Sequence, residues 1–228
     1  MPRFFCAELV QPDATFALDA RVAQHVRVLR LREGEAITLF DGSGGEVPAT
    51  LAKIDKREVI VATAAHVAVE HESSRAITLY PALIANDRMD WMIQKATELG
   101  VAEIQPMFSE RSQRIPGDVE KRVEHWRGVI VAACEQCGRN RIPEICAPVA
   151  LAEATQKTQP PSAILLDAEG DGGSTRGESA CAVFVGPEGG FSSVELNLLR
   201  ERCERRLRIG FTVLRAETAA IAALARLA

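Results

Sequence analysis

The feature that most constrains this chain is an apolar run that leads directly into a glycine-rich turn. Val183–Val185 is followed by Gly186–Gly190, which reads GPEGG. A second junction of the same kind follows closely, where Leu207–Gly210 leads into Phe211–Ala219 (FTVLRAETA). Strands that end in glycine-rich backbone before a helix are where α/β proteins bind nucleotide-like ligands. Two such junctions near one another indicate a ligand site more strongly than either one alone.

The chemistry of the first turn limits what this ligand can be. Glycine allows positive φ and lets a ligand approach the backbone closely. Ser192 and Glu195 have the spacing of a capping box, so a helix is expected to begin there. No Gly-Lys-Ser/Thr follows, and the glycines do not have the G-x-G-x-x-G spacing of a dinucleotide fingerprint. The ligand need not be a phosphate, and a plain strand-to-helix turn remains an equally open interpretation.

The chain changes its pattern near residue 72. Before it, short runs rich in Val, Ile and Thr, separated by glycine and charged turns, predict a small β-barrel with one helix over 19–30. After it, strands alternate with helices, which predicts an α/β domain with a mostly parallel sheet. The expected strands and helices of this second part lie at 76–83, 87–99, 104–108, 119–137, 163–167, 181–185 and 207–209. The predicted domains are therefore 1–72 and 73–228.

Composition sets the broad class of protein. The chain has 228 residues, of which 47% are hydrophobic, and this is enough for a true core. No apolar run approaches the roughly 18 residues of a membrane span, and residues 1–8 reach an acid before a signal-like stretch develops. We therefore expect a cytoplasmic protein with no membrane partner.

The net charge does not exclude nucleic-acid binding, and the cysteine spacing does not establish a zinc site. The net charge of −4 argues mildly against nucleic-acid binding, but residues 196–228 alone carry 7 basic and 3 acidic side chains. A local basic face thus stays possible. Cys134 and Cys137 have the gap of zinc motifs, yet no second pair follows at metal spacing. We expect ordinary helix residues there and no metal.

Several blocks in order resemble one family, the 16S ribosomal RNA uracil-N3 methyltransferases of the SPOUT class. Gly186–Ser192 and Leu214–Ala219 look like its two signature loops. The stretch Arg88–Val101 is similar to its first helix, and His25–Arg30 resembles its PUA-like N-terminal domain. Two further blocks, Glu110–Ser112 and Ala133–Asn140, also match.

The resemblance implies a fold, a cofactor and an assembly. The fold is a PUA-like β-barrel followed by a SPOUT α/β domain with a deep trefoil knot, which only the resemblance justifies because knots are rare. The cofactor is S-adenosylmethionine, and the assembly is a homodimer. The implied cofactor-binding residues are Leu166, Gly186, Pro187, Glu188, Gly189, Gly190, Ile209, Gly210, Val213, Leu214 and Arg215.

The chain departs from the family at two positions. The family commonly has Arg where this chain has Thr212, and usually Ser where it has Cys137. The first departure removes a cation from the cofactor loop. The second is nearly isosteric.

The implied reaction is methylation of N3 of a specific uridine in 16S ribosomal RNA, and the implied partner is this RNA within the small ribosomal subunit. N3 must lose a proton whose pKa is well above neutral, so the enzyme has to supply a base or stabilise the uracil anion. Arg215 is the candidate for stabilising negative charge, and Glu217 or Glu188 the candidate for assisting proton removal. No histidine lies in a motif that nominates it as the base.

Basic and amide side chains near turns are the candidate RNA contacts. They are Arg27, Arg30, Arg111, Arg114, Gln136, Arg139 and Asn140. Two alternative functions stay open at this stage. One is a SPOUT methyltransferase that acts on another RNA, and the other is a non-catalytic RNA-binding or ribosome-assembly factor.

Overall fold

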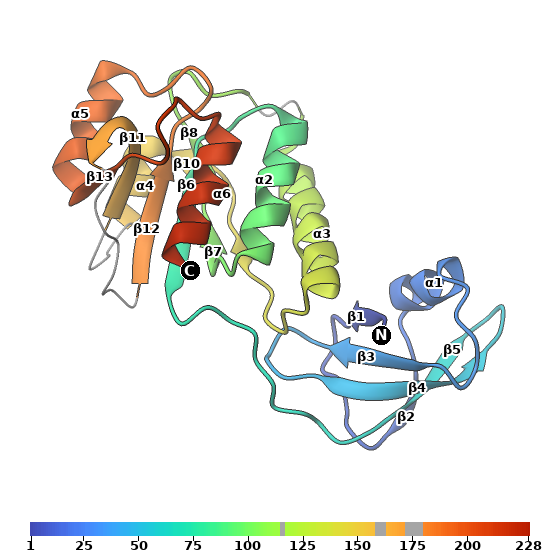
Figure 1. Ribbon diagram of the computed structural model, residues 1–228. Coiled ribbons are helices and arrows are strands. Elements are labelled where there is room, and N and C mark those ends of the chain that lie inside the picture. Colours follow the sequence, from blue (N-terminus) through green and yellow to red (C-terminus); the bar gives the residue numbers. More distant parts are fainter. Residues whose placement is uncertain (115–116, 158–162, 172–179) are drawn as a thin grey trace. The chain divides into compact units, whose positions relative to one another are not determined.

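The computed structural model describes residues 1–114, 117–157, 163–171 and 180–228 (Figure 1). The chain forms two compact units. Unit 1 contains Met1–Glu72 together with Cys134–Ile142, and unit 2 contains Ser73–Ala133 and Pro143–Ala228. No helix among the described residues is long and apolar enough to cross a membrane.

Unit 1 is built on a five-stranded sheet with one helix. The strand order is β1-β3-β4-β5-β2, in which β1 and β3 are parallel and the other pairs antiparallel. The elements are β1 (Arg3–Phe5), β2 (Thr15–Ala17), α1 (Ala20–Val28), β3 (Ala36–Phe40), β4 (Val47–Ile54) and β5 (Val59–Thr63). In β4, Val47, Ala49 and Leu51 are buried while Thr50 and Ala52 are exposed, the alternation of a strand with one face on a core.

The segment Cys134–Ile142 joins unit 1 from far along the chain. It comprises the last turn of α3 (Val119–Cys137) and the residues that follow. Arg141 forms bridges with Gly42 and Ser43 in the turn between β3 and β4. Its guanidinium also pairs with Glu70 at 3.0 Å.

Unit 2 is an α/β unit whose main sheet has six parallel strands, as predicted. Their order is β13-β11-β12-β6-β7-β9. The strands are β6 (Ala76–Pro81), β7 (Glu103–Ile104), β9 (Glu144–Ile145), β11 (Ala163–Asp171), β12 (Ala180–Val185) and β13 (Arg205–Leu207). Val183, Phe184 and Val185 of central β12 are all at most 3% exposed, because helices cover both faces of a parallel sheet.

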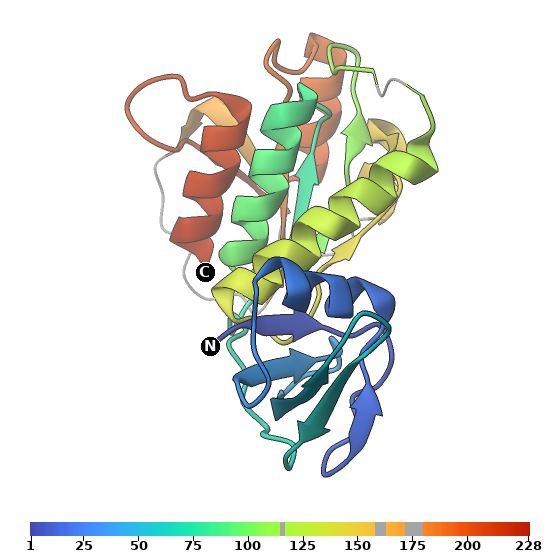
Figure 2. The same ribbon diagram turned by 90° about the vertical axis from the view of Figure 1, so that its right-hand side faces the viewer.

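Helices complete unit 2. They are α2 (Asn86–Glu98), most of α3, α4 (Leu151–Lys157), α5 (Ser193–Arg202) and α6 (Ala216–Leu227). Helices α2 and α6 lie side by side in both ribbon views, and α6 also contacts β6, β11 and β12 (Figures 1 and 2). Arg88 in the first turn of α2 lies 3.9 Å from Glu217 in the first turn of α6, so the N-termini of the two helices are neighbours.

The structure differs from two strand predictions. The expected strand 104–108 is two short strands, β7 and β8 (Met107–Phe108), and β8 pairs instead with β10 (Val149–Ala150). Pro106 lies between them, and its backbone has no N–H to continue the ladder. The last strand ends at Leu207 rather than at Ile209. The trefoil knot stays a prediction.

Candidate functional site

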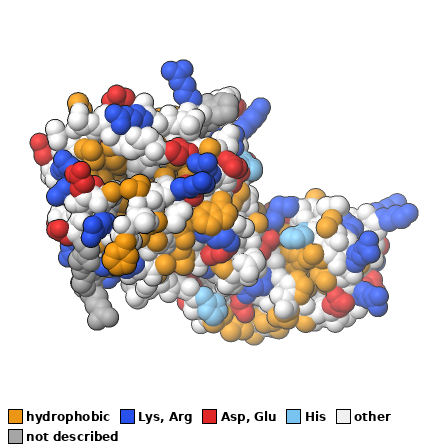
Figure 3. Space-filling model, turned by 45° about the horizontal axis from the view of Figure 1, so that its top comes forward, with side chains coloured by type: hydrophobic (Ala, Val, Ile, Leu, Met, Phe, Trp, Pro, Cys, Tyr) orange, Lys and Arg blue, Asp and Glu red, His pale blue; other side chains and the backbone are white. Residues whose placement is uncertain are grey.

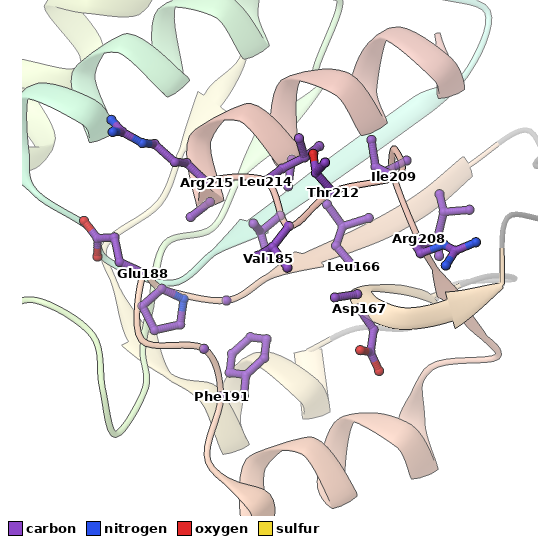
Figure 4. A pocket seen from close by; sticks show the side chains of 18 of the residues that line it. Leu166, Asp167, Val185, Glu188, Phe191, Arg208, Ile209, Thr212, Leu214 and Arg215 are labelled. Carbon is purple, nitrogen blue, oxygen red and sulfur yellow. The ribbon is translucent and has the colours of Figure 1, made fainter.

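The two glycine-rich junctions line one cavity of about 510 Å³. The first follows β12 and the second follows β13, so they meet at the same edge of the parallel sheet. All of the residues predicted to bind the cofactor line this cavity except Gly189 and Gly210. Figure 4 shows Glu188 and Arg215 towards one end of it, and Asp167 and Arg208 towards the other. We call it the strand-end cavity.

Local backbone chemistry shapes the first junction. Gly190 has φ +66°, a left-handed conformation, and its N–H donates to the carbonyl of Pro187 over 2.9 Å. The predicted capping box is confirmed. Ser192 Oγ accepts from the backbone of Glu195, whose carboxylate accepts in return from Ser192 N at 2.9 Å. The turn is thus fixed at both of its ends.

Hydrophobic side chains form much of the cavity wall, and the acid Asp167 lies among them. Val185, Phe191 and Leu207 line it and are at most 7% exposed. The Asp167 side chain is 10% exposed, and its Oδ2 atom is buried without a hydrogen bond to any described residue. The same Oδ2 atom forms ion pairs with Arg206 Nη1 at 3.5 Å and with Arg200 Nη2 at 3.6 Å.

Sequence reasoning missed several lining residues of this cavity. They are Asp167, Ala168, Val185, Phe191, Leu196, Leu207, Arg208, Thr212, Ala216 and Ala219. A usable signal existed for Asp167, because it ends the apolar run 163–167 and ligands bind at the carboxyl ends of parallel strands.

An arginine on α2 connects two of the predicted catalytic carboxylates. Glu188 Oε1 accepts hydrogen bonds from Ala85 N at 3.3 Å and from Arg88 Nη1 at 3.4 Å. Arg88 Nε also lies 3.9 Å from Glu217 Oε1. Glu188 and Glu217 are thus held by the same guanidinium, although the sequence did not nominate Arg88 for any role in the site.

A second pocket, of about 520 Å³, opens between the N-termini of α2 and α6. It is lined by Asp87, Arg88, Trp91, Arg215, Glu217 and Thr218. Arg215 lines both this helix-end pocket and the strand-end cavity. All three predicted catalytic residues, Arg215, Glu217 and Glu188, therefore lie where the two spaces adjoin, while their roles stay predictions.

The predicted RNA contacts of unit 2 lie in the loop after β8. Arg111 Nη1 donates to the carbonyl of Gly189 at 3.0 Å, so this arginine supports the first glycine turn. Arg114 is exposed. Figure 3 shows hydrophobic, basic and acidic side chains interspersed on the face of this unit that it draws, so no single-sign patch marks a site there.

In unit 1 the predicted RNA contacts divide into exposed and buried residues. Arg30 and Gln136 are exposed, and the half-buried Arg27 donates twice to the carbonyl of Asp55, at 3.2 Å each. Arg139 and Asn140 are only 3% and 0% exposed.

These two buried side chains hold segment 134–142 in unit 1. Arg139 forms an ion pair with Glu72. Asn140 Nδ2 donates to the Val69 carbonyl at 2.8 Å, and its Oδ1 accepts from Arg3. Their polar groups thus already have partners within the unit, which the linear sequence could not reveal.

The cysteine pair of α3 lies in the helix, as expected. Burial raises the pKa of the Cys134 thiol to about 12, and its Sγ points to the Arg141 carbonyl at 3.7 Å. Among residues 1–114, 117–157, 163–171 and 180–228, no cluster of three or more His, Cys, Asp or Glu side chains could hold a metal ion.

Family models match both units of the chain. The model of an RNA methyltransferase domain matches residues 71–228, and that of an RNA methyltransferase PUA domain matches residues 18–63. A ribosomal RNA small subunit methyltransferase E from Aquifex aeolicus is 31% identical to the chain, and 87% of each sequence is covered. The chain belongs to the ribosomal RNA small subunit methyltransferase E family.

Solved structures agree with this assignment over nearly the whole chain. The structure of this methyltransferase from Neisseria gonorrhoeae, bound to S-adenosyl methionine, is 34% identical with a TM-score of 0.91, covering 99% of this chain and 95% of the other. A Legionella pneumophila structure with bound SAM is 36% identical, with a TM-score of 0.92, and the match covers 99% of this chain and 96% of the other. These findings confirm the resemblance and the predicted combination of a PUA-like domain with an α/β methyltransferase domain.

Proposed function

We propose that this chain transfers a methyl group from S-adenosylmethionine to N3 of a specific uridine in 16S ribosomal RNA. The observation that carries the proposal is the meeting of both glycine-rich junctions at one cavity, in a chain of this family. N3 lies on the Watson–Crick edge, so the target base has to be unpaired or extruded to react.

The strand-end cavity suits S-adenosylmethionine. Its volume of about 510 Å³ is in the usual range of small-molecule sites. Val185, Phe191 and Leu207 offer apolar surface for an adenine ring, and the Asp167 carboxylate, whose Oδ2 has ion pairs but no hydrogen bond, offers an acceptor for hydroxyl or ammonium groups. When bound, the cofactor supplies an electrophilic methyl group on a sulfonium. Glu188 and Arg215 are the charged residues at the end next to the helix-end pocket.

The chain's own residues handle the proton and the charge. Arg215 stabilises the negative charge that develops on the uracil oxygens as N3 is deprotonated. Glu217 or Glu188 assists removal of the proton. If Arg215→Ala kept the wild-type turnover at saturating cofactor, Arg215 would have no part in the mechanism.

Basic and amide side chains that are exposed or half-buried are the proposed RNA contacts on both units. Arg27, Arg30 and Gln136 serve on unit 1, which we assign as the RNA-binding domain, and Arg111 and Arg114 serve on unit 2. Arg139 and Asn140 are left out because they are buried and their polar groups bond within unit 1. Replacing any of the four arginines should weaken RNA binding and reduce its dependence on salt. Affinity that responds to neither salt nor these changes would overturn the assignment.

The assembly and setting follow from the same proposal. We propose a homodimer that acts in the cytoplasm, where 16S ribosomal RNA is packaged into the small subunit. Sedimentation equilibrium tests the dimer directly, since a single species of 24.7 kDa would exclude it.

Mapping of methylated nucleosides by mass spectrometry tests the proposed activity. The chain and S-adenosylmethionine are incubated with unmethylated small subunits, or with the free RNA, before digestion. The proposal predicts 3-methyluridine at one position. A methyl group on another base or another RNA would favour a different methyltransferase. The absence of methylation, with no calorimetric binding of S-adenosylhomocysteine, would favour the RNA-binding factor.

A further inference from the structure

The helix-end pocket contains a buried carboxylate oxygen with no partner. Glu217 is 8% exposed, and its Oε2 makes no hydrogen bond with the part of the chain that the structure describes. Its other oxygen, Oε1, lies 3.9 Å from Arg88 Nε. A buried polar atom without a partner costs free energy, so its retention indicates a ligand that supplies a donor.

An exposed aromatic ring borders the same pocket. Trp91 on α2 is 44% exposed, in contrast to Met89, Met92 and Ile93, which point into the core. Indole rings are common stacking surfaces for unpaired bases. The helix-end pocket therefore combines the apolar ring face of Trp91 with the hydrogen-bond acceptor of Glu217.

Donors complete the lining. The guanidinium of Arg215 and the hydroxyl of Thr218 are exposed at the start of α6. The side chain of Arg215 makes no hydrogen bond or ion pair with any described residue, and only its backbone carbonyl accepts, from Ala219 N at 2.8 Å. The charged groups that face Glu217 are thus Arg88, which holds Oε1, and Arg215, with Asp87 on the same rim.

Uracil matches this set of groups. It presents a flat face, an N3–H donor, and a carbonyl acceptor on each side of that donor. We infer that the helix-end pocket binds the target uracil, with the base stacked on Trp91 and its N3–H donating to Glu217 Oε2. This inference rests on the proposed function. Because Arg215 also lines the strand-end cavity, a base bound here lies beside that cavity.

The arrangement distinguishes the two candidate bases. Glu188 Oε1 already accepts two hydrogen bonds, and its side chain is 29% exposed, whereas Glu217 Oε2 is buried and unbonded. The N3 proton passes to Glu217 Oε2, and the electron pair of the N–H bond stays on N3. Arg88 is a positioning residue that orients Glu217 by holding Oε1.

Tryptophan fluorescence tests the pocket without measuring methylation. The chain has two tryptophans, Trp91 and Trp126, and the latter is 1% exposed. Titration with a single-stranded uridine hexanucleotide, in the presence of S-adenosylhomocysteine, should quench emission saturably. Trp91→Phe should abolish the quenching, and Trp91→Ala should weaken binding in a competition assay about 5- to 150-fold. A quench that persists in Trp91→Phe would overturn the assignment.

Base preference tests the role of Glu217. Cytidine has a lone pair at N3 instead of a proton, so the wild type should bind the uridine hexanucleotide about tenfold more tightly than the cytidine one. The Glu217→Gln amide can also donate to cytidine N3, so that preference should shrink towards unity. The exposed Glu201→Gln on α5 is the control and should leave it unchanged.

Failure of this inference differs from failure of the proposed function. Equal affinity for the two hexanucleotides in the wild type, or a preference unchanged in Glu217→Gln, would overturn the inference even if 3-methyluridine forms. Absence of 3-methyluridine would overturn the proposed function, whatever the hexanucleotides show.

Discussion

The strand-end cavity and the helix-end pocket share Arg215 but are built from different materials. The strand-end cavity is made by two turns of glycine-rich backbone and by apolar side chains such as Phe191 and Leu207. The helix-end pocket is made by long side chains from two helix N-termini, among them Trp91 and Glu217. One space is defined mainly by backbone conformation, the other mainly by side-chain chemistry.

This difference predicts that substitutions can separate cofactor binding from the methylation of the base. Changes in the helix-end pocket should alter turnover and base preference while cofactor affinity stays constant. Changes in the strand-end cavity should alter cofactor affinity while turnover at saturation stays constant. A substitution that changed both turnover at saturation and cofactor affinity would show that the two spaces act as one.

The largest effect is expected for Glu217→Gln. Loss of a general base typically lowers the rate about 10²- to 10⁴-fold, and we expect kcat to fall by that amount at neutral pH. Affinity for S-adenosylhomocysteine, measured by calorimetry, should stay within about twofold, a small change on the scale of binding free energies. Activity should partly return at high pH, where uracil ionises without help. Full activity at neutral pH would exclude Glu217 as the base.

Gly210→Val should produce the next largest effect, and this effect concerns the strand-end cavity. Gly210 has φ +78°, and a β-branched residue there is strained by about 1–3 kcal/mol. If the turn relaxes to relieve this strain, affinity for S-adenosylhomocysteine should fall about 5- to 150-fold, with kcat preserved at saturating cofactor.

The matched control is Gly128→Ala. Gly128 is exposed in α3, and an added Cβ there would meet nothing within 4 Å. This change should leave cofactor affinity unaltered and raise stability by about 0.5–1 kcal/mol. Unaltered affinity in Gly210→Val would show that the second turn does not shape the cavity.

Asp167→Asn should also lower cofactor affinity, but by less. Hydrogen bonds to charged groups contribute about 1.5–3 kcal/mol, and asparagine keeps one acceptor, so we expect cofactor affinity to fall about tenfold. The melting temperature must be measured as well, because Asp167 also lies near Arg200 and Arg206. Unchanged affinity in a folded variant would place Asp167 outside the binding groups.

The smallest effect concerns the thiols. Burial raises the pKa of Cys203 to about 12, from 9.0, so its thiolate fraction at pH 8 falls about a thousandfold. Iodoacetamide should therefore modify the half-buried Cys146 of the same unit first, and leave cofactor affinity unchanged. Peptide mapping over time checks the order. Early modification of Cys203 would mean that the core beneath the strand-end cavity opens readily.

The strand-end cavity could be predicted from the sequence because its determinants are local. The glycine turn, the capping box of Ser192 and Glu195, and the apolar run before them are contiguous in the chain. Parallel strands then bring consecutive junctions to one edge of the sheet. Asp167 could have been predicted in the same way, because it follows the apolar run of another parallel strand.

The helix-end pocket could not be predicted in the same way. Arg88 meets Glu188 across one hundred positions of sequence, because β6, which leads to α2, pairs with β12, which leads to Glu188. The packing of α2 on α6 then brings the same arginine near Glu217. Periodicity could place Trp91 outside the core but could not say what it faces. The sequence likewise could not show that Arg139 and Asn140 are buried beside Glu72 and Val69.

A crystal structure with S-adenosylhomocysteine and a uridine-containing oligonucleotide tests the central claim most directly. The account predicts a uracil stacked on Trp91, with N3 within about 2.6–3.2 Å of Glu217 Oε2. It also predicts the cofactor product in the strand-end cavity, with Arg215 between the two ligands. A uracil bound with N3 directed away from Glu217, or a base bound outside the helix-end pocket, would contradict it.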